Sequence, residues 1–287
     1  ASSGVTVAPD GSSLVYSDCG QRADLLDVTV DPPAKLVDDN EVTDPVLGPG
    51  GARAWVRGAS RVLIYQDASG VERQLTVPSL GHVAFPRFDR RGENLVFQVE
   101  TGSSPGVYVV GVPPALSTPH QVSSDLPGPA IAWSADGRIV YSQVDDAKQP
   151  RVLALDVDSG TRQSLATGPR WVLDLHRGTG EQLVMARSKL YWYDPASGRE
   201  RTGPPAPPHQ GKFAALSPAG RWLVYQSGAG LWRLRLEPPG EIEHVFELGS
   251  GKTARSAQIT DDGHVVVAVS SWGGDLYRVP ARPGSRL

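Results

Sequence analysis

One short string in the sequence resembles the end of a phosphate-binding loop: GSGKT, at residues 249–253. A complete loop of this kind needs another glycine where Phe246 stands, and a helix that begins after the threonine. The residues from Ala254 to Ile259 instead have the character of a β-strand. We therefore expect the string to be a loop between two strands, and we predict no nucleotide site.

The histidines and acidic residues form no recognisable catalytic or metal-binding pattern. The sequence has six histidines but no His-Glu-x-x-His pair, and no Gly-x-Ser-x-Gly string. Only His82 and His209 fall in predicted loops that can meet at one end of the molecule. Asp156, Asp158 and Gly160 lack the rest of a calcium loop, and the same turn recurs elsewhere in the chain. We therefore predict no catalytic residue, no metal and no cofactor.

Composition excludes several classes of protein. The net charge is −3, so no basic surface for nucleic acid is expected. No apolar run is long enough to span a membrane. The single cysteine, Cys19, excludes an internal disulfide and falls in a predicted loop. Glycine (32) and proline (25) are abundant in the 287 residues, which favours many short strands joined by tight turns.

The strongest pattern in the chain is an internal repeat. An apolar residue, a turn ending in glycine and an alternating apolar strand recur as VAPDGSSLVY, FDRRGENLVF, WSADGRIVY, LSPAGRWLVY and ITDDGHVVV. The turn glycines of the seven copies are Gly11, Gly51, Gly92, Gly137, Gly180, Gly220 and Gly263. Their spacings of about 40 to 45 residues match the length of one β-propeller blade.

The repeat predicts an all-β fold: a seven-bladed β-propeller of four-stranded antiparallel blades, with six blades as the alternative. In one copy we expect strands at 131–133, 138–143, 151–155 and about 161–165. The aromatic residues that end the second strands should lie between blades. Residues 1–287 form one predicted domain, and the start at Ala1 fits the mature or excised part of a longer chain. After Val279 the chain offers no obvious outer strand for the last blade.

The copy Trp133-Ser134-Ala135-Asp136-Gly137 resembles the repeat of the TolB-type, PD40 or WD40-like propeller family, which reads roughly W-S-P-D-G before an apolar strand. The resemblance covers essentially the whole chain. It implies a propeller and an extracytoplasmic location in bacteria. It does not imply one activity, since such propellers are used as sensors, scaffolds and appendages to enzymes.

Propeller topology predicts where a partner binds. If strands A to D run from the axis outward in each blade, the D-to-A and B-to-C loops emerge on one face. Asp44 belongs to the first of these D-to-A loops, and Trp272 falls in a predicted B-to-C loop. The predicted partner-binding residues are Trp272, Arg255, Lys212, Arg170, His82 and Glu41.

These residues favour a non-enzymatic, monomeric sensor module that binds a protein or peptide through this loop face. The alternative is a small-molecule receptor, or a metal-dependent enzyme of the lyase or lactonase type, that uses the central channel.

Overall fold

The structure is a computed structural model in which most of the chain is described. The described residues are 5–7, 13–28, 34–37, 42–127, 131–134, 136–144, 150–167, 171–175, 181–186, 189–194, 197–204, 214–217, 219–236 and 242–280. For the strands nearest the two ends, and for parts of several others, the description covers the backbone alone.

Five consecutive stretches of the chain each fold into a four-stranded antiparallel sheet, as the repeat predicts. The first sheet contains β4 (Val42–Leu47), β5 (Arg53–Arg57), β6 (Val62–Gln66) and β7 (Glu72–Gln74). The second contains β8 (Val83–Phe88), β9 (Asn94–Val99), β10 (Gly106–Gly111) and β11 (His120–Ser123). The third contains β12 (Ile131–Trp133), β13 (Ile139–Val144), β14 (Pro150–Leu155) and β15 (Arg162–Thr167).

The next two sheets continue this pattern. The fourth contains β16 (Trp171–Leu175), β17 (Gln182–Ala186), β18 (Lys189–Asp194) and β19 (Arg199–Thr202). The fifth contains β20 (Ala214–Leu216), β21 (Trp222–Ser227), β22 (Gly230–Arg235) and β23 (Ile242–Glu247). Two short 3-10 helices, η1 (Pro49–Gly51) and η2 (Pro78–Leu80), lie in connecting segments, and the described residues include no helix able to span a membrane.

The two ends of the chain share the sixth sheet. Its inner strands are β24 (Lys252–Ile259) and β25 (Val265–Pro280), and β25 pairs with β2 (Ser13–Asp27). β3 (Ala34–Val37) pairs with β2 at the outer edge, while β1 (Val5–Val7) pairs with the far end of β2. The outer strands that the C-terminal end lacks are therefore supplied by the N-terminal end.

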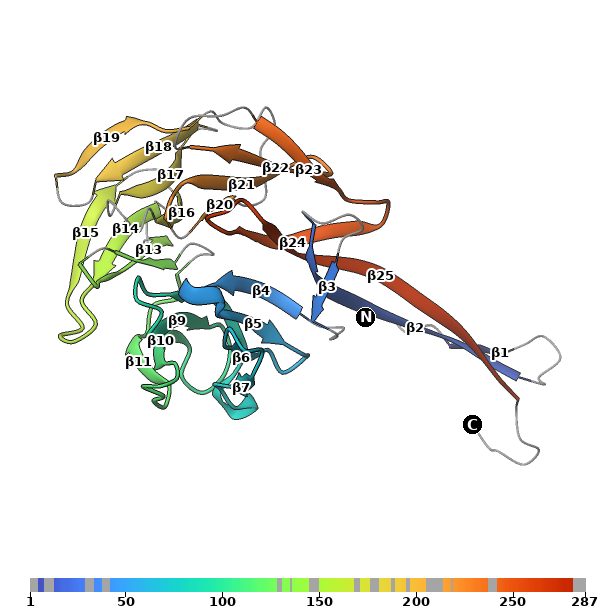
Figure 1. Cartoon of the computed structure of the whole chain (residues 1–287). Helices are drawn as coiled ribbons and strands as arrows, with labels where there is room; N and C mark the ends of the chain where they lie inside the picture. The colour runs from blue at the N-terminus through green and yellow to red at the C-terminus, as the bar shows by residue number, and fades with distance from the viewer. Residues whose placement is uncertain are drawn as a thin grey trace.

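This sharing explains the difference from the predicted blade number. The described strands form six sheets, so seven blades are not confirmed. The first and last copies of the repeat each contribute strands to the same sheet, and neither builds a sheet alone. The inner strands β4, β8, β12, β16, β20 and β24 contact one another in a closed circle. Figure 1 shows the sheets arranged as blades around a common centre.

β2 and β25 are longer than any other strands of the described chain. Beyond β3 and β24 they continue as a paired ribbon that extends away from the blades together with β1 (Figure 1). Trp272 lies within β25 opposite Gln21, and Cys19 lies within β2 opposite Gly274. The prediction that Trp272 and Cys19 lie in loops is therefore wrong. The strand pairing continues through Gly273 and Gly274, which lie opposite Gly20 and Cys19.

The local predictions agree closely with the structure. The strands expected in the third sheet differ from β12 to β15 by at most two residues at any end. Gly137 has a φ of 85°, the left-handed conformation that its turn requires. At Gly70, with φ 88°, the preceding Asp67 Oδ1 accepts hydrogen bonds from the Ser69 and Val71 N–H groups at 2.9 and 3.0 Å.

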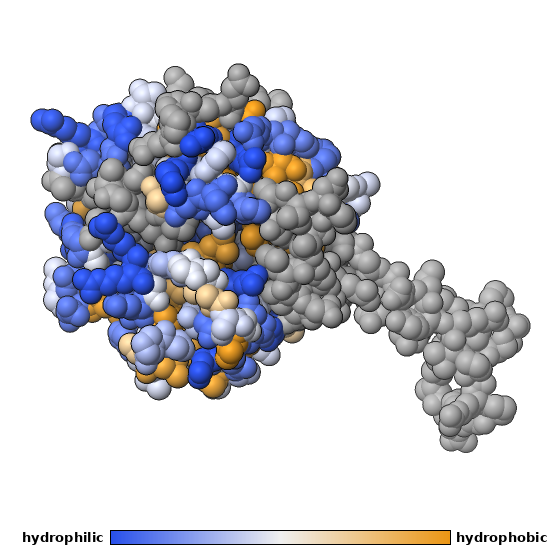
Figure 2. All heavy atoms as spheres, viewed as in Figure 1, coloured by the Kyte–Doolittle hydropathy of each residue, from blue (hydrophilic) through white to orange (hydrophobic). Residues whose placement is uncertain are grey.

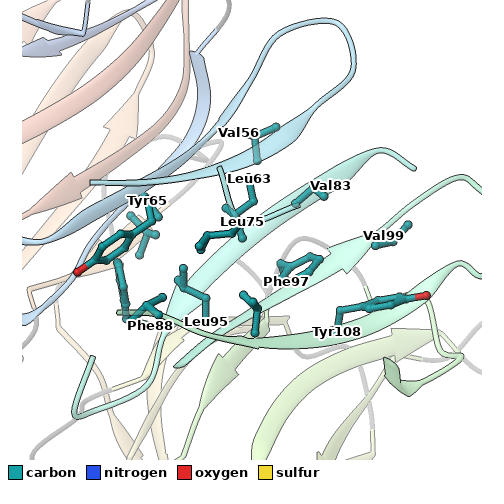
Figure 3. Close-up of a cluster of buried hydrophobic side chains, with 14 residues drawn as sticks. Val56, Leu63, Tyr65, Leu75, Val83, Phe88, Leu95, Phe97, Val99 and Tyr108 are labelled. Atoms are coloured by element: carbon teal, nitrogen blue, oxygen red, sulfur yellow. The ribbon is translucent and has the colours of Figure 1, made fainter. Parts of the chain in front are cut away.

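The core consists of layers between neighbouring sheets. Figure 3 shows one such layer, in which side chains from the first and second sheets point toward one another. Phe97 stacks on Tyr108 with ring centres 5.8 Å apart, and Tyr65 meets Phe88 edge-on. Phe97, Tyr141 and Tyr225 are all buried, which confirms the predicted layer position of these strand-ending aromatic residues. A single sheet cannot bury both of its faces, so each blade depends on its neighbours.

Candidate functional site

The structure describes the six predicted partner-binding residues to different extents. Glu41, Arg170 and Lys212 lie outside the described residues. Arg255 and Trp272 have a described backbone only, and Arg255 lies at a bulge of β24, not in a loop. His82 has a described side chain, which is exposed on the segment between η2 and β8. Of the six, His82 is the residue whose side chain the structure describes.

Beside His82 the structure places four residues that we call the β4–β8 cluster: Asp44, Arg61, Phe85 and Glu100. Arg61 Nη1 donates to Glu100 Oε2 at 2.7 Å, and Arg61 Nη2 donates to Asp44 Oδ2 at 3.4 Å. The Phe85 N–H also donates to Asp44 Oδ2, at 3.5 Å. Since Asp44 and Arg61 belong to the first sheet and the other two residues to the second, the cluster joins two blades on the predicted partner face.

The backbone of this cluster is unusual. Among the described residues, three that are not glycine have a positive φ: Asp44 at 49°, Arg61 at 47° and Phe85 at 54°. All three belong to the β4–β8 cluster. A positive φ costs a residue with a side chain roughly 1–3 kcal/mol, and such residues concentrate at functional sites. The conformations have a local cause at two of them, because β4 and β8 each carry a bulge beside a proline.

The electrostatics of the cluster centre on Asp44. Burial raises the pKa of Asp44 above its usual value, because a carboxylate loses water there. The guanidinium groups of Arg61 and Arg87 and the Phe85 N–H oppose this shift in the pKa without cancelling it. Arg61 is therefore held between one carboxylate that is mostly shielded from solvent and another, Glu100, that is more accessible.

A rigid platform of backbone lies next to the cluster. The His82 N–H donates to the Thr101 carbonyl at 3.2 Å, and the Glu100 N–H donates to the His82 carbonyl at 2.8 Å. Gly81 and Gly102 make this close approach of two loops possible, since a Cβ on Gly81 would lie 1.7 Å from the Thr101 carbonyl oxygen. The D-to-A loop and the B-to-C loop of the second sheet are thus fixed against each other.

Two exposed apolar side chains are presented by D-to-A loops on the same face. Val77 and Leu126 are each followed by proline and preceded by a buried polar residue. The residue before Val77 is Thr76, whose Oγ1 accepts a hydrogen bond from the Leu63 N–H at 2.8 Å. Such anchoring holds the apolar side chains outward. On the side of the molecule in Figure 2, apolar residues form small patches on a mostly hydrophilic described surface.

The opposite face carries a polar groove of about 890 Å³ between the second and third sheets. Its carboxylates are largely held by their own turns. Asp89 accepts from the Glu93 N–H and from Asn94 Nδ2, and Asp136 accepts from Arg138 Nε at 2.7 Å. Within the described part of the chain, no three histidine, cysteine, aspartate or glutamate side chains gather as a metal site.

The segment that resembles a phosphate-binding loop has the structure expected from its strand pattern. Lys252 begins β24, so a strand and not a helix follows the glycines. A helix N-terminus is what would bind a phosphate in such a loop.

Sequence reasoning found His82 but missed Arg61, Phe85 and Glu100, and its assignment of Asp44 to a loop is wrong, because Asp44 lies at the bulge within β4. Two signals were available. Asp44-Pro45 and Phe85-Pro86 lie 41 residues apart, one repeat length, and place a proline inside each inner strand. Arg61 closes a short hairpin loop at a position where glycine is the usual residue.

Several solved structures are similar in fold to the chain. TolB from Acinetobacter baumannii has a TM-score of 0.58 and 15% identity, over 96% of this chain and 64% of that one. An oligogalacturonate lyase from Vibrio parahaemolyticus has a TM-score of 0.52 and 9% identity, over 94% of this chain and 96% of that one. No protein-family profile matches the chain, and no curated protein matches it.

A structure assigned as TolB from Agrobacterium tumefaciens has a TM-score of 0.64 and 14% identity, over 89% of this chain and 99% of that one. At these identities the similarity establishes the fold. The chain therefore has the fold of the TolB propellers, an all-β propeller of four-stranded antiparallel blades.

Proposed function

We propose that the chain is a non-enzymatic binding module that holds a protein or peptide partner against its D-to-A and B-to-C loop face, at the β4–β8 cluster. The observation that carries the proposal is the positive φ of Arg61, a backbone conformation in which glycine would have less strain than arginine. The rigid platform at His82 and the outward Val77 give a partner a preorganised polar and apolar surface.

The energetics of Arg61 support a role in binding. Its positive φ costs about 1 kcal/mol or more. Its ion pairs with Glu100 and Asp44 are partly exposed, and pairs of this kind contribute about 0–1 kcal/mol. Stability alone therefore gives little reason to hold an arginine here, whereas recognition of a partner does.

A photo-crosslinking experiment tests the proposal. A benzophenone side chain is introduced at Val77 in the chain expressed in its own host, and crosslinked species are identified by mass. The matched control is Val71, which is 49% exposed against 59% for Val77 and lies in the same sheet, in the C-to-D turn on the opposite face. One discrete adduct at position 77 and none at 71 supports the proposal. Equal labelling at both positions, or none at either, refutes it.

The location that fits this function is extracytoplasmic, as the TolB-like fold suggests. We infer that the partner is met there, and a fractionation of host cells with an antibody against the chain tests this. Recovery of the chain solely in the cytoplasmic fraction would contradict it.

The competing candidate is a channel-based enzyme. The similarity in fold to an oligogalacturonate lyase favours it. Incubation with oligogalacturonate, with and without added divalent metal, separates the two candidates. Release of unsaturated uronate at a rate above a heat-denatured control would replace the binding module with an enzyme.

A further inference from the structure

The two contacts of Arg61 are unequal. Its contact with Glu100 is short, at 2.7 Å, but joins two accessible side chains that are 30% and 32% exposed. Its contact with Asp44 is longer, at 3.4 Å, and reaches a carboxylate that is 15% exposed. The more easily broken of the two contacts is thus the one with Glu100, because both of its groups can be solvated by water.

We propose that Arg61 receives a carboxylate of the partner polypeptide, and that Glu100 occupies this place in the free protein. The inference rests on the proposed function and adds the chemistry of recognition to it. In the free protein one guanidinium nitrogen of Arg61, Nη1, donates a hydrogen bond to Glu100. A carboxylate from a partner can approach two nitrogens together, which is the stronger, bidentate arrangement.

The backbone allows Glu100 to leave without disturbing the platform. The Glu100 N–H is bound to the His82 carbonyl, so the main chain stays in place while the side chain turns away. Asp44 cannot leave in the same manner, since it sits within β4 and also accepts from the Phe85 N–H. Asp44 therefore remains as the fixed partner that orients Arg61.

The position beside Arg61 already accommodates a carboxylate, because the Glu100 carboxylate fills it at 2.7 Å. Arg61 attracts a phosphate monoester as well, and Asp44 repels either anion, so the charge of the site alone does not choose between them. An acidic residue or a chain terminus presents the same planar group as Glu100 and matches the single negative charge of the side chain that it displaces. The geometry of the site thus favours an acidic residue or a chain terminus over a phosphorylated residue.

An apolar contact adjoins this carboxylate position. Thr76 is tied to Leu63, two residues after Arg61, and the Val83 N–H donates to the Arg61 carbonyl at 3.1 Å. These bonds hold the loop that presents Val77 alongside the start of β6. The partner segment that fits carries an apolar side chain close to its carboxylate.

The first test measures the yield of the Val77 crosslink in two variants. Glu100→Gln removes the internal competitor for Arg61. When the partner concentration is limiting, we expect the crosslink yield to rise about threefold, because binding no longer has to break an exposed ion pair. Arg61→Gln removes the receptor and should lower the yield about tenfold, as for a lost charge-assisted hydrogen bond. The matched controls are Glu93→Gln and Arg91→Gln, an exposed pair on the opposite face, which should leave the yield unchanged.

The second test uses defined probes and the Nε–Hε signal of Arg61 in ¹H–¹⁵N spectra. The probes are a blocked Ala-Glu-Leu-Ala peptide, its Gln counterpart, its phosphoserine counterpart, and Ala-Ala-Leu with a free carboxylate. A shift with the Glu peptide assigns a side-chain carboxylate, and a shift with the free carboxylate assigns a chain terminus. Either result supports the proposal when Glu100→Gln tightens binding.

Any of the following results would overturn this inference. The first is that the phosphoserine peptide binds more tightly than the Glu peptide. The second is that none of the carboxylate probes shifts the Arg61 signal at millimolar concentration. The third is that Glu100→Gln leaves the crosslink yield unchanged. If the Val77 adduct persists in Arg61→Gln, the carboxylate inference fails while the proposed binding face stands. If no adduct forms at Val77 in any variant, the proposed face itself fails. Arg61→Lys separates loss of charge from loss of the bidentate contact, with an intermediate yield expected.

Discussion

Asp44 and Phe85 occupy the same position in successive repeats, 41 residues apart, and are joined directly, since the Phe85 N–H donates to Asp44 Oδ2 at 3.5 Å. Both have a positive φ and both precede a proline in an inner strand. One repeat thus supplies the acceptor and the next supplies the donor. A carboxylate at the first position, where the next repeat has an aromatic ring, makes this junction between blades electrostatically distinct.

Replacing Asp44 by asparagine should stabilise the protein at neutral pH. Burial raises the pKa of Asp44 above 3.8, so the folded state binds this proton more tightly than the unfolded chain does. Stability from this group is fully present below the unfolded-state pKa and is lost as pH rises through the higher folded-state pKa. Asparagine is never ionised and tolerates a positive φ. Thermal unfolding from acid to neutral pH should show Asp44→Asn gaining over the parent as pH rises.

Asp67→Asn provides the opposite case. Hydrogen bonds from the Ser69 side chain and the Val71 N–H lower the pKa of Asp67. Its contribution to stability is present above the unfolded-state pKa and disappears as pH falls through the folded-state pKa. This variant should therefore lose stability at neutral pH and match the parent in acid.

The Asp44 prediction has its own contradicting outcome. A melting temperature of Asp44→Asn below that of the parent at neutral pH would mean that the ion pair with Arg61 outweighs the cost of burying the carboxylate.

Arg61→Gly and Arg61→Ala should differ in stability although both remove the guanidinium. Glycine relieves the positive φ of 47°, whereas alanine keeps the strain. We expect the alanine variant to be about 1 kcal/mol less stable than the glycine variant, with glycine close to the parent. Urea unfolding of the three proteins measures this difference. Equal stabilities for the two variants would show that the backbone at Arg61 carries no strain.

Gly81→Ala should separate the two loops that form the platform. The new Cβ would meet the Thr101 carbonyl oxygen at 1.7 Å, at a φ of 118°. We expect a loss above about 2 kcal/mol in the free energy of unfolding, together with loss of the Val77 crosslink. The matched control is Gly70→Ala, which has a positive φ but nothing within 4 Å of the new Cβ, and should cost only about 1 kcal/mol. Similar losses at the two positions would contradict this account of the platform.

Tyr141→Phe and Tyr225→Phe should have different effects. The Tyr141 hydroxyl donates to the buried Asp125, which Arg162 Nη1 also contacts at 2.7 and 2.8 Å. Its removal should cost about 1 kcal/mol or more, because Asp125 loses a donor in a buried place. The Tyr225 hydroxyl has no hydrogen-bond partner among the described residues, so its removal should change stability by less than about 0.5 kcal/mol. Calorimetry on the two variants checks the difference, and a larger loss for Tyr225→Phe would reverse the assignment.

The fold was predictable from the sequence to the level of single strands where the repeat is complete. The turn before Gly137 and the strands around it illustrate this, because apolar alternation and turn chemistry are local properties. The number of sheets was not predictable in the same way. The number depends on the pairing of Ser13–Asp27 with Val265–Pro280. These two strands are more than 200 residues apart in the sequence, and such distant pairing leaves no local sequence pattern.

The candidate site shows the same division. His82 was found because loop position follows from the repeat, whereas Asp44 was expected in a loop and lies within β4. Arg61 and Glu100 were missed because their contact depends on how two sheets approach each other. The positive φ of Phe85 arises from a bulge in β8, and a phenylalanine gives no sign of such a conformation in the sequence. The roles predicted for Trp272 and Arg255 stay predictions.

The pairing of β2 with β25 also determines how the molecule would respond to a pulling force. The two strands are antiparallel, and Ser13 lies opposite Pro280 at the far end of the ribbon. Tension applied at Ser13 and Pro280 therefore acts at one end of the ribbon and across its hydrogen bonds. The hydrogen bonds between the two strands would break one pair after another, from Ser13 toward Asp27, and would not all break together by sliding of the strands. The closed circle of inner strands would bear tension only after the ribbon had opened, so the extension protects the blades from mechanical unfolding.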